Sequence, residues 1–182
     1  MCLIKWFEKR RRRRRDRIYE GPYIDGGTRI SYDTDAPKEM ISHELQSFYC
    51  RYSTLSLVDD SIELDRGIHH FKAERGESGE SCRISYNCNT ANKETETEVS
   101  SVALLERLDA LLIKYNVAKH NGYYYKVSGL PSFYGAAIEA KFVSGETIYC
   151  YNNQDPFIPI EFIQELYELF ELTADDEKNS EE

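Results

Sequence analysis

The apolar residues of this chain recur at two spacings, one of two residues and one of three or four. In residues 82–89, apolar or aromatic side chains alternate with Arg, Ser and Asn. Successive side chains of a β-strand point to opposite faces, so this alternation predicts a strand with one buried face. Residues 68–74 form a second β-prone run, and the glycine-containing segment between the two runs predicts a hairpin.

Further β-prone runs predict more strands, at 28–32, 48–55, 123–127, 134–143 and 146–151. The last two runs predict a hairpin, and a three-residue loop is expected to place Phe142 opposite Ile148 and Ala140 opposite Cys150, because that register keeps apolar groups together. Residues 37–45 fit either a helix or an extended lead-in to the next strand, and the extended form is favoured.

The three-or-four spacing predicts two amphipathic helices, Val102 to Tyr115 and Pro159 to Glu171. Each has leucines or aromatic residues on one face and charged residues opposite. The polar run 89–98 has no hydrophobic period and is predicted to be a connection. It ends in a Thr95-x-x-Glu98 spacing that is typical of a helix capping box.

Together these elements predict an α+β fold with two layers, in which a mostly antiparallel β-sheet carries two helices packed on one face. We expect a basic N-terminal extension over residues 1–20 that is able to form a helix. A single α+β domain is expected over 21–172. An acidic, disordered tail is expected over 173–182.

The length of 182 residues suits one domain with a substantial core and is short for two. The five cysteines are scattered and contain no Cys-x-x-Cys pair, which favours a reducing compartment. The apolar stretch before the first charged run covers only residues 1–7, which is too short for a signal peptide or a membrane-spanning helix. We therefore expect a cytoplasmic protein.

Charge is strongly segregated along the chain. Residues 5–17 hold nine basic and two acidic residues, while the whole chain has a net charge of −9, so the remainder is markedly acidic. The candidate anion-binding residues are Arg10, Arg11, Arg12, Arg13, Arg14, Arg15 and Arg17. The segment 5–17 suits a nucleic acid or an anionic membrane surface, and it equally suits the acidic surface of its own chain or of a neighbouring subunit.

Tyrosines form the second candidate surface. A cluster in the predicted sheet comprises Tyr123, Tyr124, Tyr125, Tyr149 and Tyr151. Aromatic residues pack across strands and are also enriched at protein interfaces, so these side chains either stabilise the sheet or bind a partner.

No short motif with an established chemical mechanism is present in the sequence, and we assign no catalytic residue, cofactor or metal. His69 and His70 are adjacent, and on a strand they would point to opposite faces, which argues against a shared metal with Cys82 and Cys88. These cysteines, with Cys50 and Cys150, lie on strand faces that we expect to be buried, so core packing is favoured over nucleophilic catalysis.

The hypothesis that best fits the sequence is a non-catalytic interaction or assembly protein, which associates with itself or with another protein. The alternative is a nucleic-acid-associated protein that binds the phosphate backbone through the basic N-terminal segment. A third hypothesis is an enzyme with an unfamiliar active site assembled from distant residues. No small-molecule ligand follows from the sequence.

Overall fold

The computed structural model describes residues 27–55, 66–89, 93–99, 101–128 and 135–180. The strands are β1 (Thr28–Tyr32), β2 (Leu45–Ser53), β3 (Ile68–Arg75), β4 (Cys82–Cys88), β5 (Lys93–Val99), β6 (Tyr123–Val127), β7 (Ala136–Phe142) and β8 (Thr147–Asn152). The helices are α2 (Ala103–Lys114), the short 3₁₀ helix η1 (Val117–His120) and α3 (Ile160–Ser180).

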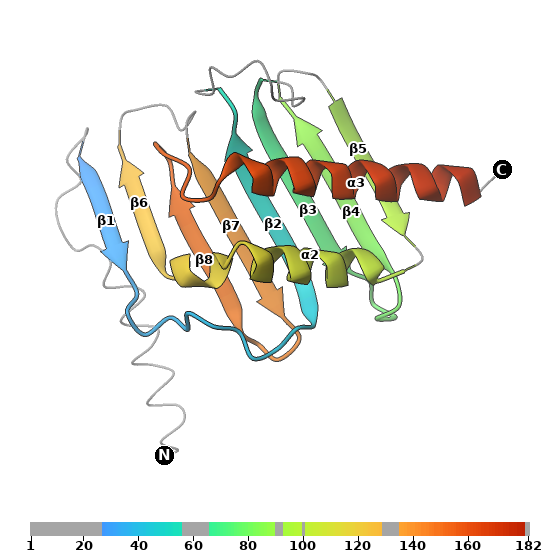
Figure 1. The fold of residues 1–182 in the computed structure, drawn as a ribbon, viewed down its shortest axis with the longest axis horizontal. Coiled ribbons are helices and arrows are strands. Elements are labelled where there is room, and N and C mark those ends of the chain that lie inside the picture. The colour runs from blue at the N-terminus through green and yellow to red at the C-terminus, as the bar shows by residue number, and fades with distance from the viewer. Residues whose placement is uncertain (1–26, 56–65, 90–92, 100, 129–134, 181–182) are drawn as a thin grey trace.

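The described strands form one eight-stranded sheet in the order β1-β6-β8-β7-β2-β3-β4-β5 (Figure 1). Every neighbouring pair is antiparallel except β6 and β8, which are parallel. The predicted α+β fold with a mostly antiparallel sheet is therefore confirmed. In Figure 1, α2 and α3 both run across the same side of the sheet. We call this side the inner face and the opposite side the outer face.

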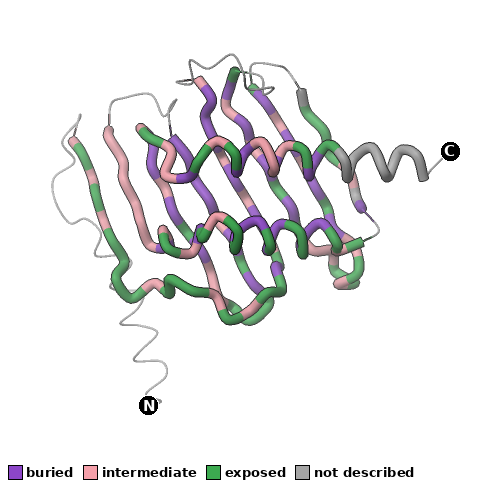
Figure 2. The backbone as a smooth tube through the Cα atoms, viewed as in Figure 1, coloured by how far each residue is buried: buried purple, intermediate pink, exposed green. Residues whose placement is uncertain are grey.

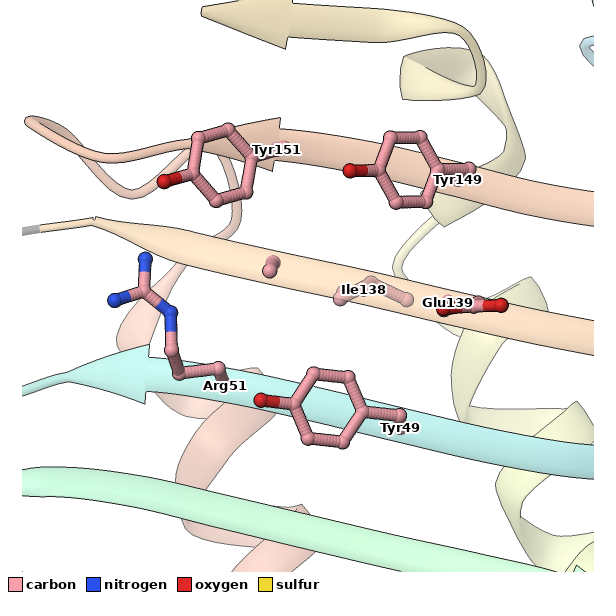
Figure 3. Close-up of a pocket in the computed structure, with 7 residues that line it drawn as sticks. Tyr49, Arg51, Ile138, Glu139, Tyr149 and Tyr151 are labelled. Carbon is pink, nitrogen blue, oxygen red and sulfur yellow. The ribbon is translucent and has the colours of Figure 1, made fainter. Parts of the chain in front are cut away.

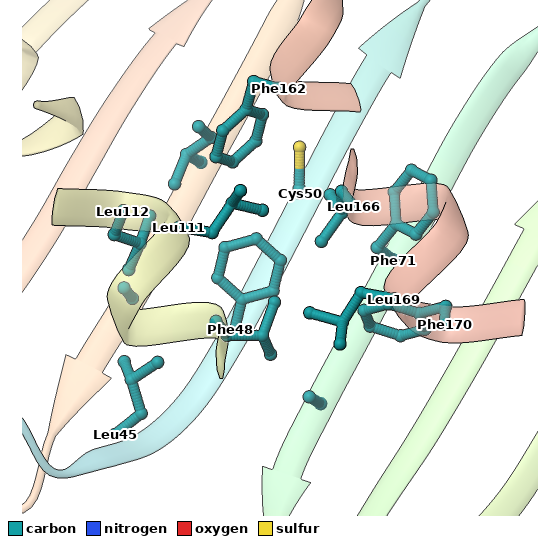
Figure 4. Packing of buried hydrophobic residues seen from close by; sticks show 14 of the residues in the cluster. Leu45, Phe48, Cys50, Phe71, Leu111, Leu112, Phe162, Leu166, Leu169 and Phe170 are labelled. Atoms are coloured by element: carbon teal, nitrogen blue, oxygen red, sulfur yellow. The ribbon is translucent and has the colours of Figure 1, made fainter. Parts of the chain in front are cut away.

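The inner face forms the hydrophobic core. Phe48 and Cys50 of β2 and Phe71 of β3 are at most 1% exposed; Phe71 lies beside Phe170 of α3, and Phe48 lies between α2 and α3 (Figure 4). The rings of Phe71 and Phe170 meet edge to face, with 5.3 Å between their centroids. Buried positions alternate with more exposed ones along the central strands, as period-two sequence patterns require (Figure 2).

The two helices are also joined to each other. The carboxylate of Glu165 on α3 accepts hydrogen bonds from the Lys114 ammonium at 2.6 Å and from the Tyr115 hydroxyl at 2.7 Å. The Tyr115 ring packs edge to face against Phe162, with centroids 5.4 Å apart. These contacts fix the end of α2 against the first half of α3.

The predicted connection over 89–98 is wrong for its described residues, because residues 93–99 form the edge strand β5 along β4. Thr95 and Glu98 lie within this strand, so they do not form the expected capping box. An edge strand pairs on one side only, and charged side chains are common there. The backbone pairing of β5 therefore needs little apolar surface; Val99, at its end, is buried.

The predicted register of the second hairpin is also wrong, by two residues. In the structure Ala140 lies opposite Ile148, and Ile138 lies opposite Cys150. A three-residue loop over 143–145 does connect the strands, and Gly145 has the left-handed φ of 87° that such loops place at their third position. Because the difference is two residues, each side chain still lies on its expected face.

Residues 37–44 contain no helix, and Leu45 begins β2, so the helical alternative for 37–45 is not adopted. The carboxylate of Glu146 accepts hydrogen bonds from the backbone N–H groups of Ile41 and Ser42, at 3.0 and 2.8 Å. At the other end of the chain, α3 continues to Ser180 and so includes most of the predicted acidic tail over 173–182.

Asparagine side chains help to hold β6 beside β8. Asn121, which is 3% exposed, donates to the carbonyl oxygens of Pro37 and Thr147 at 2.9 and 2.8 Å and accepts from the backbone N–H of Tyr149 at 2.8 Å. Beyond the other end of this parallel pair, Asn153 exchanges two 2.9 Å hydrogen bonds with the backbone of Val127. The parallel pairing of β6 with β8 comprises only two residue pairs among the described residues, and the two asparagine side chains extend it at both ends.

Candidate functional site

The outer face of the sheet brings together three of the five tyrosines proposed from the sequence. Tyr124 of β6 pairs with Tyr151 of β8, and their rings stack with centroids 5.0 Å apart and an interplanar angle of 18°. Tyr149 lies two residues before Tyr151 on the same face and is 45% exposed. The remaining two, Tyr123 and Tyr125, alternate with Tyr124 and so lie on the opposite side of the sheet.

Tyr123 is part of the inner layer. Its ring packs against Tyr32 and Phe157, with centroids 5.3 and 6.3 Å away, and it borders the hydrophobic core. The run of three tyrosines therefore does not form one aromatic platform, because the two-residue period of the strand divides it between the two faces.

The centre of the outer face is a shallow depression of about 370 Å³ (Figure 3). Tyr49 and Arg51 of β2, Glu139 of β7, and Tyr149 and Tyr151 of β8 line it. The guanidinium carbon of Arg51 lies 5.7 Å from the centroid of the Tyr151 ring, which is within the range of a cation–π contact. The depression therefore combines flat aromatic surface with a fixed positive charge.

His70 of β3 extends this cluster, and its Nδ1 lies 3.1 Å from the Tyr49 hydroxyl. Burial, with a further contribution from Arg51, lowers the pKa of His70, so its imidazole is uncharged at neutral pH. Burial also raises the pKa of Tyr49, which keeps the phenol protonated. The pair is therefore neutral, and Arg51 carries the positive charge of the cluster.

Two ion pairs lie at one end of the aromatic cluster. Lys72 and Glu74 on β3 approach to 2.9 Å, and Lys141 and Glu139 on β7 approach to 3.2 Å. The four side chains are between 43% and 55% exposed, so these pairs are solvated and add little to the stability of the fold. They form a patch of mixed charge beside Tyr49, because Glu139 and Lys72 flank it on the two neighbouring strands.

The thiols of the described cysteines face the opposite side of the sheet. Cys50, Cys82, Cys88 and Cys150 are free and buried, as the sequence predicted. Burial raises the pKa of Cys150 to about 12 and raises the pKa values of Cys50 and Cys82 as well. A buried thiol that stays protonated is a poor nucleophile, so these cysteines pack as core residues.

The adjacent histidines are divided between the faces, as predicted. His69 is fully buried, with Nδ1 3.0 Å from the Tyr86 hydroxyl and Nε2 3.2 Å from the Thr54 hydroxyl, whereas His70 belongs to the outer face. Across residues 27–55, 66–89, 93–99, 101–128 and 135–180, no group of three or more His, Cys, Asp or Glu side chains is arranged to hold a metal ion.

The candidate anion-binding residues Arg10 to Arg15 and Arg17 lie outside the described residues. No helix in the described part of the chain combines the length and the apolar character needed to cross a bilayer.

Sequence reasoning missed Tyr49, Arg51 and His70 as members of the same surface as Tyr149 and Tyr151. The alternation along β2 indicates that Tyr49 and Arg51 share one face of their strand, but it does not indicate which strands lie beside it. The sequence alone does not show that β2 pairs with β7. This pairing places Tyr49 beside Glu139, which lies about 90 residues further along the chain. The surface exists only once that long-range pairing forms.

No protein-family model, no curated protein and no solved structure matches this chain.

Proposed function

We propose that this chain is a non-catalytic interaction protein of the cytoplasm that binds a protein partner through the outer face of its sheet. The observation that carries the proposal is the cluster of Tyr49, Arg51, Tyr149 and Tyr151 around one shallow depression. Tyrosine and arginine are the side chains that most often dominate the binding energy at protein interfaces, and such residues concentrate near the centre of the contact.

The surroundings of this cluster fit the same role. A protein interface typically has an aromatic centre and a polar, solvated rim. The Lys72–Glu74 and Lys141–Glu139 pairs supply part of such a rim, at one end of the cluster. The depression is also open and shallow, whereas a site for a small molecule usually encloses most of its ligand.

Site-specific photo-crosslinking tests this function. We would replace Tyr151 with p-benzoylphenylalanine in the full chain, express it in the cells that make the protein, and compare it with the same replacement at Ile113. Ile113 is 57% exposed on α2, whereas Tyr151 is half-buried, so the control position is the more accessible of the two and would give at least as many nonspecific adducts. We expect protein adducts from position 151 and few from position 113.

The absence of adducts from position 151, or equal yields from both positions, would contradict the proposed function. Because the crosslink forms only within contact distance, an adduct specific to position 151 also assigns the contact to the outer face.

The charge segregation of the sequence favours nucleic-acid association as a second candidate function. The nine basic residues in 5–17 would bind phosphate backbones without sequence preference and with strong salt dependence. Deleting residues 1–17 should then abolish retention on an RNA column at low salt. Retention that survives the deletion would exclude this candidate.

A further inference from the structure

We infer that the open edge of β1 pairs with β1 of a second copy of this chain, so that two sheets join antiparallel about a two-fold axis perpendicular to them. This edge is separate from the tyrosine cluster, so the inference goes beyond the proposed function and does not depend on it. The exposed apolar side chains of β1, the direction of its backbone groups and the symmetry of its sequence support it.

Two large apolar side chains of β1 are exposed. Ile30 is 53% exposed and Tyr32 is 68% exposed. The Tyr32 ring contacts Tyr123 on the inner side of the sheet, and Ile30 shares this side because it lies two residues away on the same strand. In Figure 1 neither α2 nor α3 extends over β1. The inner side of β1 is therefore an apolar strip that the helices leave uncovered.

The backbone of β1 directs one set of polar groups away from the sheet. The Gly27 carbonyl accepts a hydrogen bond from the Ser128 N–H at 2.8 Å, and the Asp33 N–H donates to the Gly122 carbonyl at 3.0 Å. The odd-numbered residues thus direct their backbone groups to β6, which is the only strand that pairs with β1 among the described residues. Backbone groups alternate in direction along a strand, so those of the even-numbered residues point to the open edge. The residues with outward-pointing N–H and C=O groups are Thr28, Ile30 and Tyr32.

These outward-pointing groups are symmetric about Ile30. When Ile30 lies opposite Ile30 of the second copy, Thr28 of each copy lies opposite Tyr32 of the other. Every outward-pointing N–H and C=O group then has a partner, as in the hydrogen-bonded pairs of an antiparallel ladder. The neighbouring symmetric registers centre on Arg29 or Ser31, and each leaves one outward-pointing residue of each strand without a partner in β1.

The side chains also suit this register. Tyr125 of β6 lies opposite Ile30, so the inner side would carry a continuous row from Tyr125 through both Ile30 side chains to Tyr125 of the second copy. Aromatic and β-branched residues on neighbouring strands stabilise a sheet. On the outer side, Arg29 of each copy lies opposite Ser31 of the other. The register centred on Ile30 therefore sets no like charges opposite each other.

The other edge of the sheet does not suit self-pairing. β5 has the sequence KETETEV, and its Glu94 and Glu96 are exposed. Any symmetric antiparallel pairing centred on residue 95, 96 or 97 would set a glutamate opposite a glutamate, which is unfavourable. Charged side chains on an edge strand commonly prevent such pairing. β1 has one charged residue in five, so of the two edges only β1 has the composition of a pairing edge.

The chain that follows β1 leaves its edge open. After Tyr32 the chain turns toward β6, where Asp33 bonds to Gly122. The carbonyl of Pro37 then accepts a 2.9 Å hydrogen bond from the side chain of Asn121. Residues 33–37 therefore lie on the β6 side, and a second copy would approach from the side that they do not occupy.

The size of the contact indicates a reversible dimer. An edge of five residues at about 3.3 Å each, in a sheet about 10 Å thick, covers roughly 170 Å². A standard interface buries about 800 Å² on each partner, so we expect a dimer that dissociates on dilution. Because the axis is perpendicular to the sheet, both outer faces point the same way. Their β8 strands are five strand spacings apart, or about 24 Å, so the dimer would offer two tyrosine clusters on one side.

Ile30→Lys tests the inference, because it places two like charges opposite each other at the centre of the pairing. Ile113→Lys is the matched control, since Ile113 on α2 is 57% exposed and the substitution is the same. We would measure the mass of the full chain by sedimentation velocity across a dilution series. We expect dimers of the unaltered chain and of Ile113→Lys at high concentration. Ile30→Lys should need a concentration at least about tenfold higher to form them.

Disulfide trapping tests the register in a full chain that carries Cys2→Ser. The four described cysteines are buried and should not interfere. Ile30→Cys should form a disulfide-linked dimer under mild oxidation, because opposite residues of a hydrogen-bonded pair have Cα atoms about 5.5 Å apart, which suits a disulfide. Thr28→Cys should not link to itself, but it should link to Tyr32→Cys in an equimolar mixture. Ile113→Cys measures the yield from random collision.

Monomers at every concentration would overturn the inference, as would dimers equally stable in Ile30→Lys and Ile113→Lys. Equal disulfide yields from Ile30→Cys and Ile113→Cys would also overturn it. If Ile30→Cys links to a different protein in a cell extract and not to its own copy, the edge binds another strand and the identity of the partner is wrong. Dimers lost only on deletion of residues 1–20 would assign the association to that segment instead. Crosslinking from position 151 probes the outer face, so the proposed function stands or fails separately.

Discussion

Replacing Asn121 with alanine should strongly destabilise the fold, because one side chain joins three backbone segments. The substitution removes three hydrogen bonds of 2.8 to 2.9 Å, to Pro37, Thr147 and Tyr149, from a residue that is 3% exposed. A typical hydrogen bond contributes about 1 kcal/mol net, and a buried group left without a partner costs about as much again or more. We therefore expect a loss of about 3 to 4 kcal/mol in the free energy of unfolding.

Urea unfolding followed by circular dichroism measures this loss, which is a large fraction of the 5 to 15 kcal/mol that is typical of a folded domain. Asn87→Ala is the matched control, since Asn87 lies on the outer face and is half-buried. Its cost should be below about 1 kcal/mol. If Asn121→Ala costs no more than Asn87→Ala, the asparagine does not hold β6 beside β8 and the reasoning is refuted.

Three further outcomes follow from the fold. Gly135→Ala should lower the melting temperature by several degrees more than Gly79→Ala, because a Cβ at 135 would overlap the backbone of Asn152 at the end of β8. At Gly79 nothing lies within 4 Å, so alanine there adds only the strain of the left-handed φ of 79°. Hydrogen bonds from Lys114 and Tyr115 lower the pKa of Glu165 below its ordinary 4.5. The carboxylate therefore stabilises the fold above pH 4.5, and this stabilisation is lost as the pH falls through the lowered pKa. Glu165→Gln should make the free energy of unfolding depend less on pH in the acid range, and an unchanged dependence would contradict the assignment. Cys150, whose thiol pKa burial raises to about 12, should resist alkylation at pH 8 in the native protein and react in urea, whereas fast labelling of the native chain would show that β8 opens.

The elements that sequence patterns predicted are those in which burial imposes a period. β4 and α2 each have an apolar face that must be covered, so their apolar residues repeat every two or every three to four positions, and the predicted segments agree closely with the structure. β5 was missed because an edge strand is held by backbone hydrogen bonds to one neighbour. Its sequence, KETETEV, has no apolar residue before Val99, so no hydrophobic period marks it as a strand.

The outer face was predicted only in part, for a related reason. The alternation along β8 placed Tyr149 and Tyr151 on one side of their own strand, but which strands lie beside β8 depends on long-range pairing. Because β6 inserts between β1 and β8, and β7 pairs with β2, the strand order differs from the order along the chain. The alternation of residues along one strand shows which side chains share a face of that strand. Which side chains of other strands lie beside them depends on the strand order of the folded sheet.

Footprinting of two tyrosines tests the central claim, that the outer face is covered in the assembled protein. Tyr149 is 45% exposed on the outer face, and Tyr32 is 68% exposed at the end of β1 with its ring against Tyr123 on the inner side. Hydroxyl-radical labelling of the full chain, read by mass spectrometry, compares the two tyrosines in one sample, first in the purified protein and then in an extract of the cells that make it. We predict that the extract lowers the labelling of Tyr149 severalfold relative to that of Tyr32; an unchanged ratio of the two labelling yields would contradict the account.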